Sequence, residues 1–400
     1  APLAVQLLGY LDGEGHGAAG LEAAFDELLT GSGAGDTLLC TVNAQGKLRA
    51  EPVLTPADSG AVGVQLTLSR EIQQTAEAVA NETMQSGCIL VLDTANAKVR
   101  ACVSRPGYDP ENISASLNAP DSPLLERAFQ CYAVGSVFKP VLAATALEAG
   151  LQPVFECTGA VVVDGQIFRC AGGVPHGQVD LAAALEKSCN GYFIRLGQQL
   201  DAESLLDAAK AFGFGQSLPL AEGFAAEAGQ LPTPQELAQS GQLANFSFGQ
   251  GSLLAAPMQV AALFNTLAAD GVYRAPYVLQ ATLDETTGQP VEILSHPRGR
   301  RVISAQNAAL LRAMLVQVVQ QGTAQDAAGL SGGAGGKTGT AQTGQFTPEG
   351  TERCNLWFAG FWPAEKPRYT IVVLQDGAVH TAYSGATIFA QVCNALEAAG

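Results

Sequence analysis

The hydrophobic pattern of the chain changes period several times, and each change marks a predicted element. Residues 71–84 repeat apolar positions every three to four residues behind Thr67 or Ser69 as a capping residue, which predicts an amphipathic helix. The apolar runs 88–93 and 98–104, separated by a four-residue turn, predict the two strands of a hairpin. A helix and a strand pair therefore open the main body of the protein.

Helical spacing dominates the middle of the chain, and strand-like sequence returns near its end. The predicted helices are 136–149, 181–187, 191–200, 205–212, 258–269 and 305–321. The predicted late strands are 337–342, 356–361 and 369–374, followed by a last helix at 385–398. Early and late strands that enclose a helical middle predict an α+β fold, in which one antiparallel sheet is covered by helices.

Residues 1–62 differ from the rest, because they are rich in Gly, Leu and Ala, with a helical stretch around 21–29 and short strand-like pieces such as 38–42. A chain of 400 residues exceeds what one compact core usually holds. We therefore expect a small amino-terminal region over 1–62 and a larger domain over 63–400. The chain begins at Ala1 with no charged and apolar leader, which indicates a fragment whose start, with any membrane anchor, was removed.

The charge of the chain narrows the classes of function. Its 37 acidic and 21 basic residues give a net charge of −16, which opposes the phosphate neutralisation that drives nucleic-acid binding. Nucleic acid is therefore excluded as a partner, and no basic patch favours a membrane surface. No uninterrupted apolar stretch reaches the roughly 20 residues that a membrane-spanning helix needs.

Nine cysteines are an odd number for a disulfide framework, and none forms the C-x-x-C pair that structural zinc sites often use, so we expect no metal. Cys88 and Cys102 sit in strand-like runs, as buried thiols would. Cys157 and Cys170 flank a hairpin pattern at 161–167. A disulfide between these two and a pair of free thiols remain equally open, because sequence spacing does not fix the geometry that a disulfide needs.

Ser136 and Lys139 form the only Ser-x-x-Lys in the chain, and an offset of three residues places both side chains on one helix face, where they can touch. A lysine whose pKa is lowered by an apolar pocket, here Phe138 and Val141, can take the proton of a serine hydroxyl. Pro140 is compatible with this helix only if residues 136–139 form its first turn. In isolation, a capping serine and a solvated lysine explain the pattern better.

Two further motifs support a catalytic interpretation. Ser188 and Asn190 lie in the break between two predicted helices, where a hydroxyl and a carboxamide can project from a loop into a cleft. In the predicted strand Lys337-Thr338-Gly339-Thr340, alternation puts Lys337 and Gly339 on one side and both threonines on the other. We expect Gly339 to keep its face open, so that a substrate strand can lie along this edge.

The order Ser-x-x-Lys, Ser-x-Asn, Lys-Thr-Gly resembles the penicillin-binding protein and serine β-lactamase superfamily, whose motifs these are. Further segments resemble the class B, monofunctional penicillin-binding transpeptidases over nearly the whole chain, namely Gly9-Tyr10, Gly20-Leu21-Glu22, Arg127, Tyr132, His176-Gly177, 249–251 and 257–259. The resemblance implies a five-stranded antiparallel sheet flanked by helices, with 1–62 as part of an amino-terminal pedestal. It implies D,D-transpeptidation of peptidoglycan stem peptides ending in D-Ala-D-Ala, without a cofactor.

The same resemblance assigns roles to the motif residues. Ser136 would be the acylated nucleophile and Lys139 its base. Ser188 would relay a proton to the leaving amine, Asn190 would orient the substrate amide, and Lys337 would hold the field near that relay.

Thr338 and Thr340, on either side of Gly339, would bind the terminal carboxylate. The backbone N–H groups of Ser136 and Thr340 would form the oxyanion hole. β-Lactam antibiotics would acylate the same serine. The resemblance also implies a position at the extracytoplasmic face of the bacterial cell membrane, with an anchor segment absent from this chain and with glycosyltransferase or other cell-wall partners.

Two other motifs compete with this interpretation. Residues 331–338 miss the phosphate-binding loop G-x-x-x-x-G-K-[ST] only at its first position, but a helix precedes them and no helix follows. Residues 329–333 match the hydrolase elbow G-x-S-x-G, which needs an aspartate and then a histidine later in the chain. The single later histidine is His380, and the one aspartate between, Asp376, lies only four residues before it in the same segment. A glycine linker explains this stretch better, and His176 is interpreted as a structural loop histidine.

Within the superfamily, alternatives remain open. Asn190 and Lys337 are 147 residues apart, longer than compact β-lactamases use. A D,D-carboxypeptidase differs only in choosing water as the acceptor, and the motifs do not separate it from a transpeptidase. A non-catalytic β-lactam sensor or a cell-wall scaffold would carry the same residues.

Overall fold

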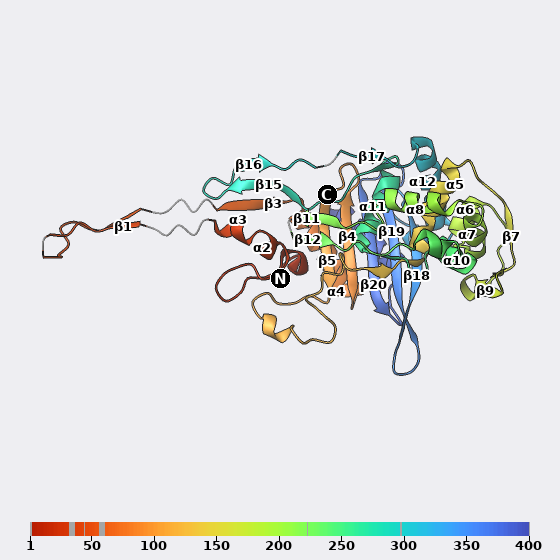
Figure 1. The fold of residues 1–400 in the computed structure, drawn as a ribbon, viewed down its shortest axis with the longest axis horizontal. Coiled ribbons are helices and arrows are strands. Elements are labelled where there is room, and N and C mark those ends of the chain that lie inside the picture. Colours follow the sequence, from red (N-terminus) through yellow and green to blue (C-terminus); the bar gives the residue numbers. More distant parts are fainter. Residues whose placement is uncertain are drawn as a thin grey trace.

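A five-stranded antiparallel sheet forms the centre of the computed structural model, which describes residues 2–31, 37–43, 45–55, 61–221, 223–296 and 298–399. The strand order is β18-β19-β20-β4-β5 (Figure 1). The bounds are β18 (Gly335–Phe346), β19 (Glu352–Trp362), β20 (Tyr369–Ala378), β4 (Gly87–Asp93) and β5 (Val99–Arg105). Early and late segments of the chain therefore share one sheet, and the predicted α+β fold with five strands is confirmed.

Helices cover both faces of this sheet, and β4 and β20 are accordingly buried along most of their length rather than at alternate positions. α4 (Arg70–Thr83) and α13 (Gly385–Ala399) pack on one face, and α11 (Pro257–Ala268) packs on the other. Ser69 caps α4 by accepting a hydrogen bond from the backbone N–H of Ile72. Thr67, the other predicted cap, donates instead to the carbonyl of Val99 at 2.8 Å.

The helical middle of the chain lies beside β18, and every predicted helix of this region is found. Its helices are α5 (Lys139–Glu148), α6 (Leu181–Glu186), α7 (Asn190–Gly197), α8 (Ala202–Ala211), α9 (Pro234–Leu237), α10 (Ser240–Ser247) and α12 (Ala305–Gln320). The short 3-10 turns are η1 (Ile113–Ala115), η2 (Gly135–Phe138), η3 (Ala171–Gly173) and η4 (Gln325–Ala327). α12 packs on both β18 and α6, so it joins the sheet to the helical region.

Short two-stranded sheets lie around this core. They are β6 (Tyr132–Ala133) with β13 (Leu254–Ala255), β7 (Phe155–Cys157) with β10 (Gly177–Val179), β8 (Ala160–Val163) with β9 (Gln166–Arg169), β11 (Leu218–Ala221) with β12 (Phe224–Ala226), and β14 (Val272–Tyr273) with β17 (Arg300–Arg301). The β8–β9 pair is the hairpin predicted at 161–167. Its turn residues Asp164 and Gly165 both have positive φ, as a tight two-residue hairpin turn requires.

The amino-terminal segment contributes to the main core rather than lying apart from it. It contains α1 (Val5–Leu8), α2 (Gly20–Ala24), α3 (Asp26–Thr30), the pair β1 (Thr37–Leu39) with β2 (Val53–Thr55), and β3 (Val62–Leu66). Leu7 and Leu21 are buried in the same cluster as the central strands. β3 forms a second sheet with β15 (Leu279–Asp284) and β16 (Pro290–Ile293). The single helix predicted at 21–29 divides at Phe25, and the boundary at 62 stays a prediction.

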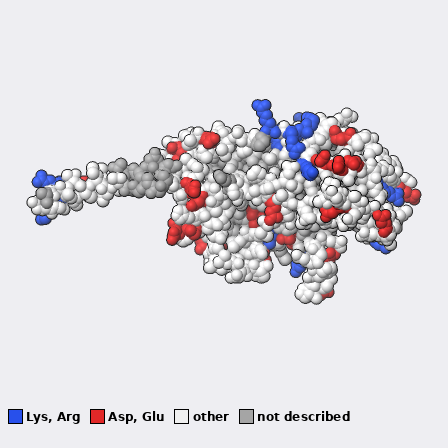
Figure 2. Space-filling view, viewed as in Figure 1, with Lys and Arg blue, Asp and Glu red and all other residues white. Residues whose placement is uncertain are grey.

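The surface carries few basic residues. On the face shown in Figure 2, basic side chains gather mainly near β17, with acidic side chains spread around them. Within the described part of the chain, no helix combines the length and apolar character needed to cross a membrane.

The fit between η2 and the segment at Gly249 can be tested by a pair of substitutions. Gly249 and Gly350 have nearly the same φ, 85° and 86°. A Cβ on Gly249 would lie 1.9 Å from the carbonyl oxygen of Gly135, whereas a Cβ on Gly350 would meet nothing within 4 Å. We expect Gly350→Ala to lower the free energy of unfolding by about 1–2 kcal/mol through backbone strain alone. Gly249→Ala should lower it by about 1–3 kcal/mol more, because the backbones must separate.

Urea unfolding followed by tryptophan fluorescence measures both values. Equal losses for the two variants would contradict the close approach of Gly249 and Gly135.

Candidate active site

A cleft of about 920 Å³ lies between β18 and the helical region, and it collects the predicted motif residues. Its walls include Ser136, Ser188, Asn190, Thr338, Gly339 and Thr340. The two motif lysines, Lys139 and Lys337, are completely buried and do not line the cleft. Three segments that are far apart in the sequence therefore meet at one place.

Ser136 lies in the 3-10 turn η2, immediately before α5. Sequence periodicity predicts one helix over 136–149, and the structure instead begins it with this tighter turn. The N–H of Lys139 donates to the carbonyl of Ser136, and Pro140, the next residue, has no N–H to offer that carbonyl. Pro140 lies in the first turn of α5, as the sequence requires. Ser136 is thus held at the amide-rich start of a helix.

Lys139 is fixed by the Ser188 loop. Its Nζ donates to the carbonyl of Ser188 at 2.8 Å and to Asn190 Oδ1 at 2.7 Å, and lies 3.1 Å from Ser188 Oγ. Phe193 places its ring centroid 5.5 Å from the same nitrogen. Burial lowers the pKa of Lys139 from 10.5 to about 7, so that near neutral pH a substantial fraction of the amine is uncharged. Among the described residues, no hydrogen bond joins Lys139 to Ser136 Oγ.

The loop between α6 and α7 carries Ser188 in a left-handed conformation, with a φ of 54°. A serine rarely adopts this conformation, so the surrounding contacts must hold it. Cys189 caps α7 by accepting a hydrogen bond from the N–H of Tyr192. Asn190 Nδ2 donates to the carbonyl of Arg169 at 2.9 Å, which ties the loop to the β8–β9 hairpin.

The strand β18 is the edge of the sheet, and its side chains alternate as the sequence predicts. Lys337 is buried while Thr340 is exposed to the cleft. Lys337 Nζ donates to the carbonyl of Thr338 at 3.1 Å. Burial, and then the like charge of Lys139, hold the pKa of Lys337 well below its ordinary range. Thr338 Oγ1 lies 2.7 Å from the hydroxyl oxygen of Thr323.

The expectation that Gly339 keeps its side of the strand open is wrong. A Cβ at Gly339 would lie 3.1 Å from both Val137 Cγ1 and the carbonyl oxygen of Val134. The missing side chain therefore lets β18 lie directly against η2. The side of β18 that is available to a substrate is the one that carries the two threonines.

Cys157 and Cys170 lie together, as their flanking of the hairpin suggests, but their sulfurs are 3.7 Å apart and not bonded. A disulfide would require about 2.05 Å. Cys189 Sγ lies 3.9 Å from Cys170 Sγ, and His176 Nδ1 lies 3.4 Å from Cys157 Sγ. Sequence reasoning did not bring these four residues together. The available signal was three cysteines and one histidine within 33 positions.

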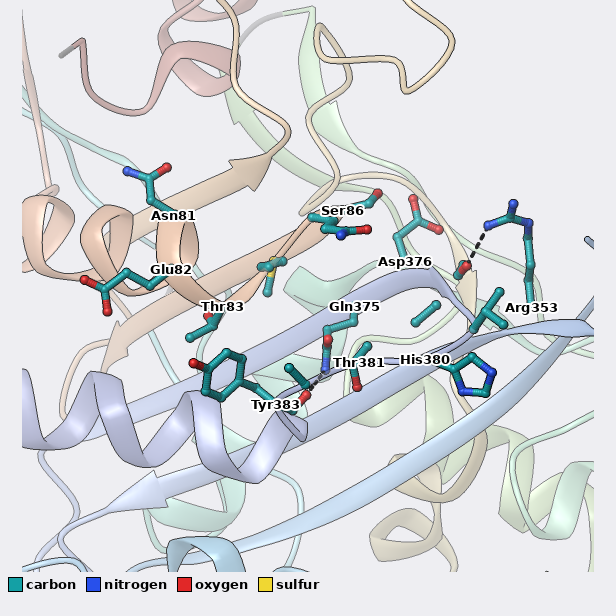
Figure 3. A pocket seen from close by; sticks show the side chains of 16 residues that line it. Asn81, Glu82, Thr83, Ser86, Arg353, Gln375, Asp376, His380, Thr381 and Tyr383 are labelled. Atoms are coloured by element: carbon teal, nitrogen blue, oxygen red, sulfur yellow. Dashed lines mark hydrogen bonds between the residues drawn. The ribbon is translucent and has the colours of Figure 1, made fainter.

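A second cleft, of about 400 Å³, lies at the ends of α4 and β20 (Figure 3). Arg353 donates there to the carbonyl of Gly377 at 3.1 Å, and Gln375 donates to the carbonyl of Tyr383 at 3.1 Å. None of the three motifs contributes to its lining. The chemistry therefore belongs to the cleft at Ser136.

The site has the features of a serine acyl-transfer enzyme. They are a half-buried serine at a helix start, a buried lysine of lowered pKa, and a polar loop that holds this lysine. The model of the penicillin binding protein transpeptidase domain matches residues 87–396. The chain therefore belongs to the penicillin-binding protein transpeptidase family.

Individual relatives agree with this assignment. The chain is 31% identical to peptidoglycan D,D-transpeptidase PbpA of Mycolicibacterium smegmatis, with 96% of this chain and 80% of the relative covered. It is 28% identical to stage V sporulation protein D of Bacillus subtilis, covering 96% and 60% of the two chains. Penicillin binding protein 3 of Mycobacterium tuberculosis, complexed with aztreonam, superposes with a TM-score of 0.81 at 28% identity, over 99% of this chain and 88% of that one.

The lowered pKa of Lys139 predicts a pH dependence. Only the unprotonated amine accepts a proton, so the competent fraction grows as the pH rises through about 7. We expect the rate constant for acylation by a fluorescent penicillin to increase about tenfold between pH 6 and pH 8. Stopped-flow measurements in one constant-ionic-strength buffer series test this, with the melting temperature recorded at each pH as a control. A rate constant that stays flat over this range would rule out Lys139 as the base.

Proposed function

We propose that this domain crosslinks peptidoglycan by D,D-transpeptidation, with stem peptides that end in D-Ala-D-Ala as acyl donors. The observation that carries the proposal is the buried Lys139, whose pKa of about 7 suits a general base and whose hydrogen bonds hold Ser188 and Asn190 at the cleft. Several relatives are named peptidoglycan D,D-transpeptidases, which supports the same reaction.

In the first step, Ser136 Oγ attacks the carbonyl carbon of the penultimate D-Ala, and its proton passes to Lys139 Nζ. The backbone N–H groups of Ser136 and Thr340 would stabilise the oxyanion; a Cβ on Gly135 would lie 2.8 Å from the carbonyl oxygen of Thr340, so these two segments adjoin. The bond to the terminal D-Ala then breaks. Its nitrogen receives the proton through Ser188, whose Oγ lies 3.1 Å from Lys139 Nζ.

In the second step, the amino group of another stem peptide attacks the ester on Ser136. The new amide bond forms as the ester C–O bond breaks, and a proton from the amine passes to Ser136 Oγ, which restores the free serine. The exposed edge of β18 offers backbone groups that can pair with an extended donor peptide. Thr338 and Thr340 would bind the terminal carboxylate, supported by Lys337. Asn190 would orient the donor amide.

This function assigns the domain to the extracytoplasmic face of the bacterial cell membrane, where peptidoglycan is polymerised. An amino-terminal segment outside this chain would anchor it, and residues 1–62 would belong to a pedestal between the membrane and the catalytic domain. The partners would be a membrane glycosyltransferase or other cell-wall proteins.

A pair of serine substitutions tests the nucleophile. We expect Ser136→Ala to abolish the covalent penicillin adduct, because the variant lacks the hydroxyl that would form the ester with penicillin. Ser331→Ala should leave the adduct unchanged; the structural contact of Ser331 is its backbone carbonyl, which accepts from Trp362 Nε1 at 2.7 Å. Intact mass and peptide mapping after incubation with penicillin measure both. An adduct that survives in Ser136→Ala, or is lost in Ser331→Ala, would favour the competing elbow motif.

The choice of acceptor is tested with a synthetic stem peptide ending in D-Ala-D-Ala and a labelled D-amino acid. A transpeptidase should exchange the terminal D-Ala for the label, because an amine competes with water for the acyl-enzyme. Chromatography with mass detection measures exchange and hydrolysis together. Hydrolysis without exchange would identify a carboxypeptidase, and rapid release of a penicilloyl adduct would identify a β-lactamase.

A further inference from the structure

A second group of reactive side chains lies next to the catalytic cleft. Within the part of the chain that the structure describes, one group of cysteine, histidine and carboxylate side chains has its ligand atoms close enough to share a metal ion. It consists of Cys157, Cys170, His176 and Cys189, and their ligand atoms all lie within 4.8 Å of one another. The four come from separate places: the end of β7, the start of η3, the loop before β10 and the cap of α7.

The distances between these atoms approach those of a tetrahedron around zinc. With a Zn–S bond of about 2.3 Å, two sulfurs on such a tetrahedron are about 3.8 Å apart. Cys170 Sγ lies 3.7 Å from Cys157 Sγ and 3.9 Å from Cys189 Sγ. His176 Nδ1 lies 3.4 Å from Cys157 Sγ. Small side-chain movements would bring all four atoms onto one ion.

A disulfide accounts for this group less well. Cys170 is in contact with two other sulfurs, so a bond to either one leaves the third thiol and the imidazole without a function. All three sulfurs are buried, which shields them from outside partners. Three thiols and one imidazole without a carboxylate form a donor set typical of structural zinc.

Backbone amides at the start of α7 favour thiolates at this place. The N–H of Tyr192 donates to Cys189 Sγ at 3.4 Å, and the N–H of Gly191 interacts with Cys170. A Cβ on Gly191 would lie 3.8 Å from Cys157 Sγ, so this glycine lets the helix start approach the sulfurs. N–H groups at a helix start stabilise negative charge, as three metal-bound thiolates would require.

We propose that Cys157, Cys170, His176 and Cys189 bind one Zn²⁺ ion, which holds the Ser188 loop in its catalytic conformation. Cys189 stands between Ser188 and Asn190, the two residues that hold Lys139. Cys170 follows Arg169, whose carbonyl accepts from Asn190. The ion joins the β8–β9 hairpin to this loop, so two walls of the cleft share one fixed point. The three cysteines would bind as thiolates, so each thiol that is protonated beforehand releases its proton, and the imidazole would bind in its neutral form.

The first experiment measures metal content. The chain is purified without chelators and without an immobilised-metal column, and its zinc is determined by elemental mass spectrometry. We expect one zinc ion per chain. Replacement by Co²⁺ should give the visible absorption of tetrahedral cobalt and a thiolate-to-cobalt charge-transfer band. A chain that remains free of metal after incubation with Zn²⁺, or that carries a Cys157–Cys170 disulfide by peptide mapping, would overturn the proposal.

A matched pair of substitutions locates the ion. Cys170→Ala should weaken zinc binding by at least about tenfold, because it removes a ligand. Cys393→Ala, which removes a buried free cysteine of α13, should leave the zinc content unchanged. Equal zinc content in the two variants would contradict the assigned ligands. If Cys170→Ala does not fold, the wild-type chain is used instead: zinc is removed with a chelator and Zn²⁺ is then added back.

The positioning role has its own readout. Removal of zinc from the wild-type chain should lower the acylation rate at saturating penicillin by about 10–100-fold, with a smaller change in the half-saturating concentration, and Zn²⁺ should restore it. Unchanged acylation in metal-free protein that remains folded would overturn this role. Metal content does not depend on Ser136, so a failure here is distinguishable from a failure of the proposed transpeptidation.

Discussion

The burial of Lys139 is the constraint on which the catalytic site depends. Removing an ammonium group from water costs on the order of several kcal/mol, so the side chain is stable only where its hydrogen bonds are satisfied or its proton is lost. The Ser188 loop meets the first condition, since it supplies the carbonyl and the carboxamide oxygen that bind the buried Nζ. The burial that makes these contacts necessary also lowers the pKa of Lys139 to about 7. Packing and catalytic competence are therefore one requirement at this position.

A second constraint is the close approach of three backbones around Ser136. Gly135 has a φ of 60° and donates its N–H to the carbonyl of Gly249 at 2.9 Å, while Gly339 lies against Val137. Side chains at these glycines would push β18 and the Gly249 segment away from η2. The position of Ser136 thus depends on glycines in the surrounding segments, because they have no side chains. The proposed oxyanion hole needs this arrangement, because its two N–H donors come from separate segments and must lie within hydrogen-bond reach of a single oxygen.

Much of the fold follows from local pattern, and the parts that do not are those that depend on contacts between distant segments. Periodicity predicts α4, β4, β5 and α13 to within a few residues, and the Asp164-Gly165 turn predicts the β8–β9 hairpin, because these features are local. The 3-10 turn at Ser136 was not predicted, since a 3.6-residue period does not distinguish it from the start of an α-helix. The buried side of Gly339 could not be read from strand alternation either, because alternation separates two faces without saying which one is covered. The four-residue sulfur and histidine group was missed for a similar reason: its members are 13, 6 and 13 positions apart, and only the folded chain brings them together.

The Ser188 loop shows why a tether beyond Lys139 is physically reasonable. A neutral amine has one fewer proton to donate than an ammonium, so the contact between Lys139 and the loop weakens in the state that would act as base. A serine in the left-handed region would then relax unless something else held the chain. The cap at Cys189 and the bond from Asn190 to Arg169 remain in place whichever protonation state Lys139 adopts. A metal ion bound through Cys189 and Cys170 would reinforce both of these contacts, and so would hold the Ser188 hydroxyl in place for the proposed proton relay.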